Sequence, residues 1–342
     1  MRNRWLLPLM MVIVSTVLQV PAVVAADEIN LYSARKENLI KPLLDRFTAH
    51  TGIRVNLVTG KADALLKRLQ IEGRNSPADL LITTDAGRLH RAVMAGVTQP
   101  VESEILASVV PEAFRDPERH WYGLSLRARP ILYVKGKVDP TSLSSYEALS
   151  APAWKGKICI RSSDNIYNQA LVASLIAANG ESQTGDWANG LVQNFARPPK
   201  GGDRDQIKGA AAGICDIAIA NTYYLVGMLK SKDAGERAAA EKMAVFWPNQ
   251  ADRGAHVNIS GAAVTASAKH RESAIRLLEF LVGKESQQWY AEVNGEYPVR
   301  ADVAVSEPLK GWGEFKMDTL NLSQLGELNP AAVKLMDRVG WK

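Results

Sequence analysis

Cysteine and histidine are scarce in this sequence, whose 342 residues include two cysteines and five histidines. The histidines are His50, His90, His120, His256 and His270. None of them has another potential ligand at the spacing that zinc sites use. A zinc enzyme or a soft-metal protein is therefore not expected. His256 can approach a cleft from an extended segment, but we interpret it as a structural polar residue.

Motifs of the common enzyme classes are also missing. The chain contains no G-x-S-x-G, no H-E-x-x-H, no G-x-x-x-x-G-K and no G-x-G-x-x-G. A secreted hydrolase that uses a cleft carboxylate or serine stays open as an alternative, although no nucleophile motif supports it. We therefore expect a binding protein and not an enzyme.

Neither basic nor acidic residues are in large excess. Lys and Arg number 41 and Asp and Glu number 36, which gives a formal net charge of +5. Without residues 1–26, which contain two arginines and no acidic residue, the net charge falls from +5 to +3. Because the basic residues are scattered among acidic ones, we expect no nucleic-acid partner.

One apolar run stands out, and it lies at the N-terminus. Arg2 and Arg4 precede "WLLPLMMVIVSTVL", and "PAVVAA" ends in small residues, which is the pattern of a secretory signal peptide. A membrane anchor is the alternative, but polar residues interrupt the run before the roughly 20 residues that a span needs. We expect residues 1–26 to be removed on export by cleavage near Ala25 or Ala26, leaving a soluble chain.

The two cysteines lie in apolar, strand-like runs. Cys159 is in "GKICIR" and Cys215 is in "GICDIAI". An exported protein meets oxidising conditions, so a disulfide between neighbouring strands is one interpretation. A pair of buried free thiols is the other, and the sequence does not decide between them.

Strand-like and helix-like segments alternate along the chain, which predicts an α/β fold with a parallel sheet covered by helices on both faces. The first series comprises 28–34, 37–52, 53–60, 62–73, 78–84 and 87–96. A second series begins after the extended run "WYGLSLRARPILYVKG", and a further extended run, "AHVNISGAAVTAS", follows it. Two lobes joined by two extended crossings explain this order. Ligands in such sheets bind beyond the carboxyl ends of the strands.

The stretch "DIAIANTYYLVG" ends an apolar alternating run with Tyr223 and Tyr224. In a strand, neighbouring side chains point to opposite faces, so the two phenols can act together only at a strand-to-helix corner. Packing of both rings with the hydroxyls at a polar edge is the alternative.

A second corner, "RSSDNIYNQ", carries a third tyrosine, Tyr167. Ser162, Ser163, Asp164 and Asn165 are suited to capping the helix that follows. Capping alone does not explain the tyrosine. If the corners lie in one lobe, the three phenols converge on one cleft.

Three phenols suit a hard trivalent cation. A free phenol has a pKa near 10, and a trivalent cation strongly favours its deprotonated form. Hard charged oxygens match a hard metal, so ferric iron is the natural candidate. An anion or water would fill the remaining coordination positions.

The chain resembles the periplasmic ferric-iron-binding proteins of ABC importers, within the type II solute-binding proteins. The motifs that carry this resemblance are "LYSAR", "SPADLLITTDAGRL", "SLRARPILYV", "RSSDNIYNQ", "IANTYYLVG", "VNISGAAV" and "GEYPV", in order along the chain. The resemblance implies two α/β lobes, each a mixed sheet flanked by helices, with a hinged cleft between them. We expect an N-terminal lobe of residues 27–128 and 258–305, and a C-terminal lobe of residues 129–257 and 306–342.

The resemblance also implies the metal ligands. Tyr223 and Tyr224 match the paired tyrosine ligands of the family, and Tyr167 matches a third. Some relatives carry a histidine after "SAR", where this chain has Lys36. The adjacent Glu37 is either a further ligand or a solvated first-turn carboxylate.

Relatives without that histidine are thought to complete the shell with carbonate or a similar anion held by arginines. Arg35 and Arg127 match those positions, and Arg129 is a weaker candidate. An arginine fork suits bidentate binding of an oxyanion. For Arg35, which precedes a helix, a solvated side chain is the alternative.

Three further residues are weaker candidates. Asp85, in "ITTDAG", falls in a loop that supplies a carboxylate ligand in some relatives. Ser162 and Ser163 are candidates for contact with the anion.

These observations predict a monomeric periplasmic protein that closes two lobes on ferric iron and delivers it to an inner-membrane ABC permease. A protein of the same fold that binds a polyamine, thiamine or an oxyanion stays open as the alternative, because paired phenols also suit a cationic organic ligand.

Overall fold

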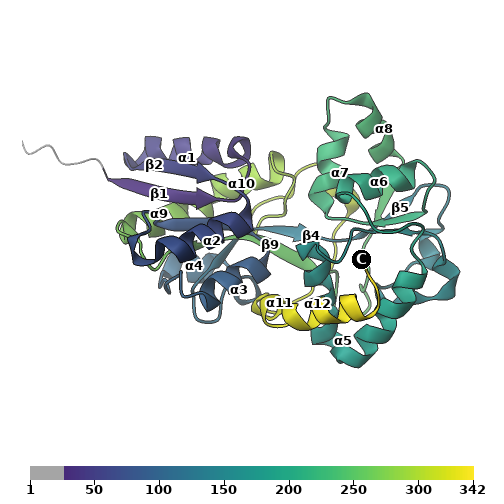
Figure 1. Cartoon of the computed structure of the whole chain (residues 1–342). Helices are drawn as coiled ribbons and strands as arrows, with labels where there is room; N and C mark the ends of the chain where they lie inside the picture. Colours follow the sequence, from purple (N-terminus) through teal and green to yellow (C-terminus); the bar gives the residue numbers. More distant parts are fainter. Residues whose placement is uncertain (1–26) are drawn as a thin grey trace, which may run out of the picture.

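The computed structural model describes residues 27–342, which form two α/β lobes side by side (Figure 1). The expected signal peptide, residues 1–26, lies outside the described residues. Within residues 27–342, no helix combines the length and apolar character needed to cross a membrane.

The N-terminal lobe contains a five-stranded mixed sheet with the order β2-β1-β3-β9-β4. Its strands are β1 (Glu28–Ser33), β2 (Arg54–Thr59), β3 (Leu80–Thr84), β4 (Tyr122–Ala128) and β9 (Val257–Val264). β1 pairs with β2 and β3 in parallel, whereas β9 runs antiparallel to both β3 and β4. Every residue of β4 and β9 is buried, because helices or the other lobe cover both faces.

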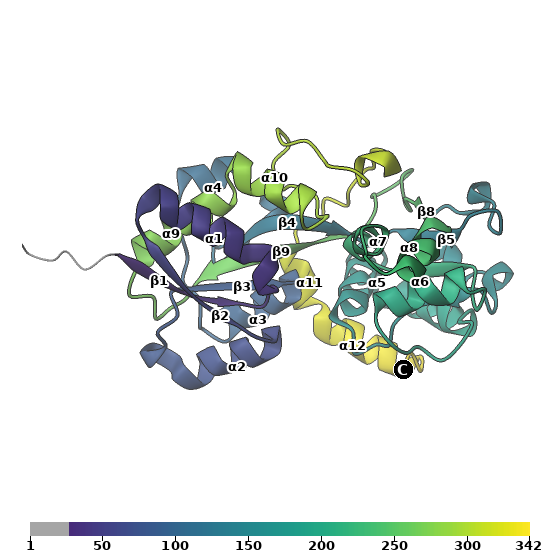
Figure 2. The same cartoon turned by 90° about the horizontal axis from the view of Figure 1, so that it is seen from above.

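Helices cover both faces of this sheet, as the view in Figure 2 shows. One side carries α1 (Glu37–Thr51), α9 (Arg271–Leu281) and α10 (Lys284–Glu292), with α4 (Glu104–Val109) near them. The other side carries α2 (Ala62–Glu72) and α3 (Ala86–Met94). In α1 the buried side chains Ile40, Leu43, Leu44 and Phe47 recur at helical spacing, as the sequence predicts.

The C-terminal lobe contains a four-stranded sheet with the order β6-β7-β5-β8. Its strands are β5 (Ile131–Val134), β6 (Ile158–Cys159), β7 (Ile217–Ile219) and β8 (Met243–Phe246). Its helices are α5 (Ile166–Gln193), α6 (Asp203–Ala211), α7 (Thr222–Leu229) and α8 (Ala234–Glu241). α5 has a break at Gly180, where φ is 78°.

The two crossings between the lobes follow the extended runs found in the sequence. β4 ends at Ala128 in one sheet and β5 begins at Ile131 in the other, so Arg129 and Pro130 form the first crossing. The chain returns between β8 and β9. The expected fold class, two mixed sheets flanked by helices, is confirmed.

The C-terminal segment spans both lobes. α12 (Asn329–Arg338) packs against α5, but α11 (Ser323–Glu327) contacts both α3 and α5. The amide of Leu322 donates a hydrogen bond of 3.0 Å to the carbonyl of Ala113 in the N-terminal lobe. Part of residues 306–342, a segment expected in the C-terminal lobe, thus also contacts the N-terminal lobe.

The two cysteines form a disulfide. Cys159 lies on β6 and Cys215 precedes β7, and their Cα atoms are 5.9 Å apart. The bond joins two parallel neighbours of the C-terminal sheet, in agreement with the first of the two interpretations drawn from the sequence.

Candidate metal centre

Tyr223 and Tyr224 lie in the first turn of α7, directly after β7. Asn221 is the N-cap residue, with extended backbone angles of φ −71° and ψ 144°. Because neighbouring helical residues are turned by about 100°, two successive side chains can share one side of the helix. The ring centroids lie 4.3 Å apart with a tilt of 35°. The corner therefore presents two phenols together, as a strand would not.

Tyr167 lies in the first turn of α5, at the second corner. Asn165 caps the helix, because its Oδ1 accepts a hydrogen bond from the amide of Asn168. The guanidinium of Arg127 bridges the two corners: its Nη1 donates to the Tyr167 hydroxyl over 3.5 Å, and its central carbon lies 4.9 Å from the Tyr223 ring centroid. Three phenols thus gather around one arginine of the opposite lobe.

Burial changes the ionisation of the paired tyrosines. Burial and the nearby Tyr167 phenol together raise the pKa of Tyr224 to about 12. Burial likewise raises the pKa of Tyr223, again helped by Tyr167 and opposed by the charge of Arg127. A cation that binds these two hydroxyls must therefore displace their protons.

Arg35 and Arg127 share one buried carboxylate, that of Glu296. Nη2 of Arg35 and Nη2 of Arg127 each lie 3.1 Å from Oε1 of Glu296. Both arginines also donate to the Ser260 hydroxyl at 2.6 Å, and the Ser125 hydroxyl donates to Glu296. Burial pushes the pKa of Glu296 up, but the two arginines outweigh it and hold that pKa below its ordinary value.

This cluster carries two positive charges and one negative charge beside the phenols. Arg35 is 4% exposed, which excludes the solvated alternative for its side chain. Sequence reasoning missed Glu296, although it lies in the "GEYPV" motif. The signals that could have identified Glu296 were its place in this motif and the two arginines expected in the cleft, which need a negative partner.

A model of the family described as "Bacterial extracellular solute-binding protein" matches residues 75–319. The chain belongs to this family. The resemblance seen in the sequence is confirmed, and the family binds solutes, so the chain is a solute-binding protein and not an enzyme.

Relatives and solved structures agree with this assignment. The chain is 51% identical to "Iron uptake protein A1" of Synechocystis sp. over 316 residues, covering 92% of this chain and 88% of the relative. A Trichodesmium structure, IdiA (FutA) in complex with iron and citrate ligands, has 52% identity and a TM-score of 0.91, covering 92% and 100% of the two chains. The structure titled "Bordetella ferric binding protein" has 44% identity and a TM-score of 0.86, covering 92% and 99%.

Two weaker ligand candidates of the solute-binding protein are carboxylates, Asp85 and Glu37. Asp85 caps α3: its Oδ1 accepts from the amide of Gly87 and its Oδ2 from the Asn258 amide, each at 2.8 Å. Burial raises the pKa of Asp85 to about 6. Glu37 is exposed at the start of α1. Neither carboxylate is therefore brought to the phenols by a contact of the structure.

The serines of the second corner shape the loop before α5. The Ser162 carbonyl accepts from the Asn168 side chain at 3.1 Å, and the Ser163 carbonyl accepts from the Gln169 side chain at 2.9 Å. The Ser162 hydroxyl donates to Asp164. Of the four residues suited to capping, Asn165 is the one that caps α5, and the other contacts fix the loop before it.

Arg129 is bonded inside the C-terminal lobe. It is 1% exposed, and its guanidinium donates to Asp203 at 3.1 Å, to Asn221 at 2.9 Å and to Asn168 at 2.6 Å. These contacts occupy both Nη atoms, and the expected role of Arg129 in holding an anion stays a prediction. His256 is buried as expected, and burial, with Arg129 and Arg253 nearby, lowers its pKa to about 3.

The lobes also touch beside the phenols. Lys230, just after α7, donates to the carbonyl of Glu292 in the N-terminal lobe over 2.9 Å. Gly295, with φ +63°, packs so closely on Val226 of α7 that a Cβ there would lie 2.6 Å from it. The segment that carries Glu296 is thus in contact with the helix that carries the tyrosines.

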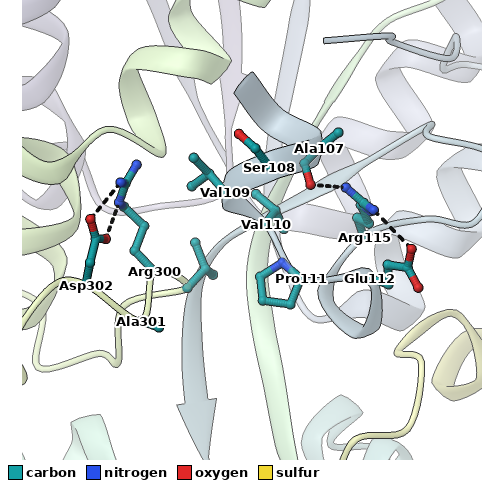
Figure 3. Close-up of a pocket in the computed structure, with 11 residues that line it drawn as sticks. Ala107, Ser108, Val109, Val110, Pro111, Glu112, Arg115, Arg300, Ala301 and Asp302 are labelled. Carbon is teal, nitrogen blue, oxygen red and sulfur yellow. Dashed lines mark hydrogen bonds and ion pairs between the residues drawn. The ribbon is translucent and has the colours of Figure 1, made fainter. Parts of the chain in front are cut away.

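A cavity of about 590 Å³ lies elsewhere, between residues 107–115 and 299–302 (Figure 3). Its two arginines are already bonded, Arg115 to the Ala107 carbonyl and Glu112, and Arg300 to Asp302. No tyrosine lines this cavity. Within residues 27–342, no group of three His, Cys, Asp or Glu side chains is placed to hold a metal.

Proposed function

We propose that this solute-binding protein captures ferric iron between its lobes through Tyr167, Tyr223 and Tyr224, and delivers it to an inner-membrane ABC permease. The observation that supports this most is the gathering of three phenols around Arg127. Three phenolates balance the charge of the ferric ion, and the oxygens suit a hard cation. The printed names of the relatives point to the same solute.

The shell would be completed by an oxyanion such as carbonate on the side of Arg127 and Arg35. Two guanidinium groups with one carboxylate leave one net positive charge, which supports the binding of an anion next to the metal. Glu37 and Asp85 are left out of this ligand set because of their exposure and capping contacts. The protein would act as a periplasmic monomer after removal of residues 1–26.

Iron binding is tested by an absorption titration of the mature protein with ferric citrate, with and without bicarbonate. We expect a broad visible band from phenolate-to-iron charge transfer that saturates at one iron per chain. Tyr223→Phe should lose most of this band. Tyr32→Phe is the matched control, because the Tyr32 hydroxyl bonds Glu72 in the N-terminal lobe at 3.0 Å, away from the site.

A wild-type protein that stays colourless at saturating iron would contradict the proposal. The same titration with a polyamine or thiamine, followed by calorimetry, would then identify which other solute the cleft binds. An equal loss of the band in Tyr32→Phe would show that the effect of Tyr223→Phe is not local.

A further inference from the structure

Arg129 lies where the chain crosses from one lobe to the other. Its backbone amide donates to the carbonyl of His256 in the second crossing over 3.1 Å. Its own carbonyl accepts a hydrogen bond of 2.7 Å from the hydroxyl of Tyr146, which is buried in the C-terminal lobe. The backbone of Arg129 is thus anchored to both crossings and to the lobe that carries the tyrosines.

The side chain of Arg129 extends from this crossing into the C-terminal lobe and contacts four separate elements. Nη1 donates to Asp203 at the start of α6 and to Asn221 at the N-cap of α7. Nη2 donates to Asn168 in the first turn of α5 at 2.6 Å, and to the carbonyl of Ile219 at the end of β7 at 3.3 Å. One guanidinium therefore joins both corners that carry the phenols.

Two of these acceptors are close in sequence to the tyrosines. Asn168 follows Tyr167 directly, and Asn221 precedes Tyr223 by two residues. The side chain of Asn168 is fixed on its other side as well, because its Nδ2 donates to the carbonyl of Arg161 at 2.8 Å. A change in the position of Arg129 would therefore be passed to the first turns of both helices.

The side chains of Arg129 and its hydrogen-bond partners are buried. Arg129 is 1% exposed, Asn168 and Asn221 are 0% and 3% exposed, and Asp203 is 1% exposed. The Asp203 carboxylate pairs with Arg129 at 3.1 Å and also with Arg161 at 2.8 Å, so two arginines share it. A planar fork with several fixed donors is a geometry that only arginine supplies, since a lysine offers one point charge on a flexible chain.

We propose that Arg129 is the positioning residue that holds Tyr167 in register with Tyr223 and Tyr224 and ties this arrangement to the hinge. It contacts no metal and binds no anion. It sets the distance between the two corners, so that the three phenols are already positioned for the metal on the C-terminal lobe before the N-terminal lobe closes. This inference rests on the proposed binding of ferric iron by the three tyrosines.

The test compares Arg129→Lys with wild type in the ferric citrate titration, recording both the affinity and the wavelength of the visible band. We expect an affinity about 10- to 100-fold lower, as for other groups that orient metal ligands. We also expect the band to move, because the tyrosine oxygens meet the iron in a changed geometry. Asn221→Ala, which removes one acceptor and keeps the Asp203 ion pair, should change both quantities in the same direction.

Arg253→Gln is the matched control for a general loss of stability. Arg253 also forms partly buried ion pairs in the C-terminal lobe, with Glu147 at 2.7 Å and Asp318 at 3.4 Å, but it bonds neither asparagine. We expect this variant to unfold at a lower urea concentration and to keep the wild-type band. A band shift in Arg253→Gln equal to that in Arg129→Lys would overturn the positioning role.

The outcomes separate this inference from the proposed function. A wild-type band that Tyr223→Phe abolishes, together with an unchanged band and affinity in Arg129→Lys, overturns the role of Arg129 alone. If Arg129→Lys does not fold, Asn221→Ala decides in the same way. A wild-type protein without a band overturns the proposed function, and this inference with it.

Discussion

The guanidinium of Arg127, on β4 of the N-terminal lobe, lies over the ring of Tyr223 in the C-terminal lobe, with 4.9 Å between its central carbon and the ring centroid. The contact places a permanent positive charge against a phenol that, in the proposed function, loses its proton when the metal binds. Burial raises the pKa of Tyr223 and the charge of Arg127 lowers it. Arg127 therefore joins the lobes and also favours the metal-binding form.

Ferric binding should weaken as the pH falls. Because burial raises the pKa of Tyr224 to about 12 and also raises that of Tyr223, the free protein holds these protons throughout the neutral range. Each proton released on binding changes the apparent affinity by about tenfold per pH unit. Arg127→Gln should lower the affinity by about 10- to 100-fold at each pH. Competition with a chelator, calibrated at each pH between 6 and 8, measures both effects.

Parallel plots of log affinity against pH for wild type and Arg127→Gln are the expected result, since the number of protons released is unchanged. An affinity that does not vary with pH in the wild type would contradict phenolate ligation. An unchanged affinity in Arg127→Gln would contradict the role given to its charge.

Gly295→Ala should hold the lobes apart. The added Cβ would lie 2.6 Å from a methyl group of Val226, on the helix that carries Tyr223 and Tyr224. Alanine at φ +63° is also strained, so a control with the same strain is needed. Gly96→Ala supplies it, because Gly96 has φ +64° and nothing within 4 Å of an added Cβ.

We expect both alanine variants to lose a similar small amount of stability, and Gly295→Ala alone to bind iron more weakly. Small-angle scattering with saturating iron should show a larger radius of gyration for Gly295→Ala than for Gly96→Ala. Equal iron affinity in the two variants would show that closure does not depend on the contact with Val226.

Two substitutions in the arginine cluster should change the response to carbonate in opposite directions. Arg35→Ala removes a fork that faces Glu296, so we expect weaker iron binding with less dependence on added bicarbonate. Glu296→Gln raises the net charge of the cluster from +1 to +2, so the same dependence should increase. For each protein, the iron affinity with bicarbonate divided by the affinity without it gives a bicarbonate ratio.

Thermal unfolding serves as the control for both variants, because an unpaired buried charge is destabilising by about 3–5 kcal/mol. Equal bicarbonate ratios in wild type, Arg35→Ala and Glu296→Gln would contradict the proposal that an anion completes the coordination shell of the iron.

The sequence pointed to the tyrosines but not to the carboxylate of Glu296, and the difference has a physical reason. Tyr167 and Tyr223 stand at strand-to-helix corners, and the topology of a sheet brings such corners to one edge. Glu296 meets Arg35 across 261 residues, a pairing that no local pattern contains. The fold class followed from alternating periodicity, whereas the path of the C-terminal segment depended on long-range packing of α11.

Arg129 shows what the residue type alone leaves open. An arginine next to a cleft strand matches an anion-binding role, and nothing in its own segment contradicts that role. Its ion-pair partner in the structure, Asp203, begins α6, which no motif of the sequence indicated. Both side chains are buried, and burial is not visible in the sequence.

His256 should make the protein less stable in mild acid. In the folded chain, burial and two arginines lower its pKa to about 3, whereas an unfolded histidine has a pKa near 6.5. Between these values the unfolded state binds one more proton, so stability falls as the pH falls, by about 1.4 kcal/mol per pH unit from this residue. His256→Gln should lose that part of the slope. Urea unfolding at pH 7, 6, 5 and 4 measures it, with the exposed His50→Gln as control. A slope in His256→Gln identical to that of wild type and the control would show that other groups account for the loss of stability in acid.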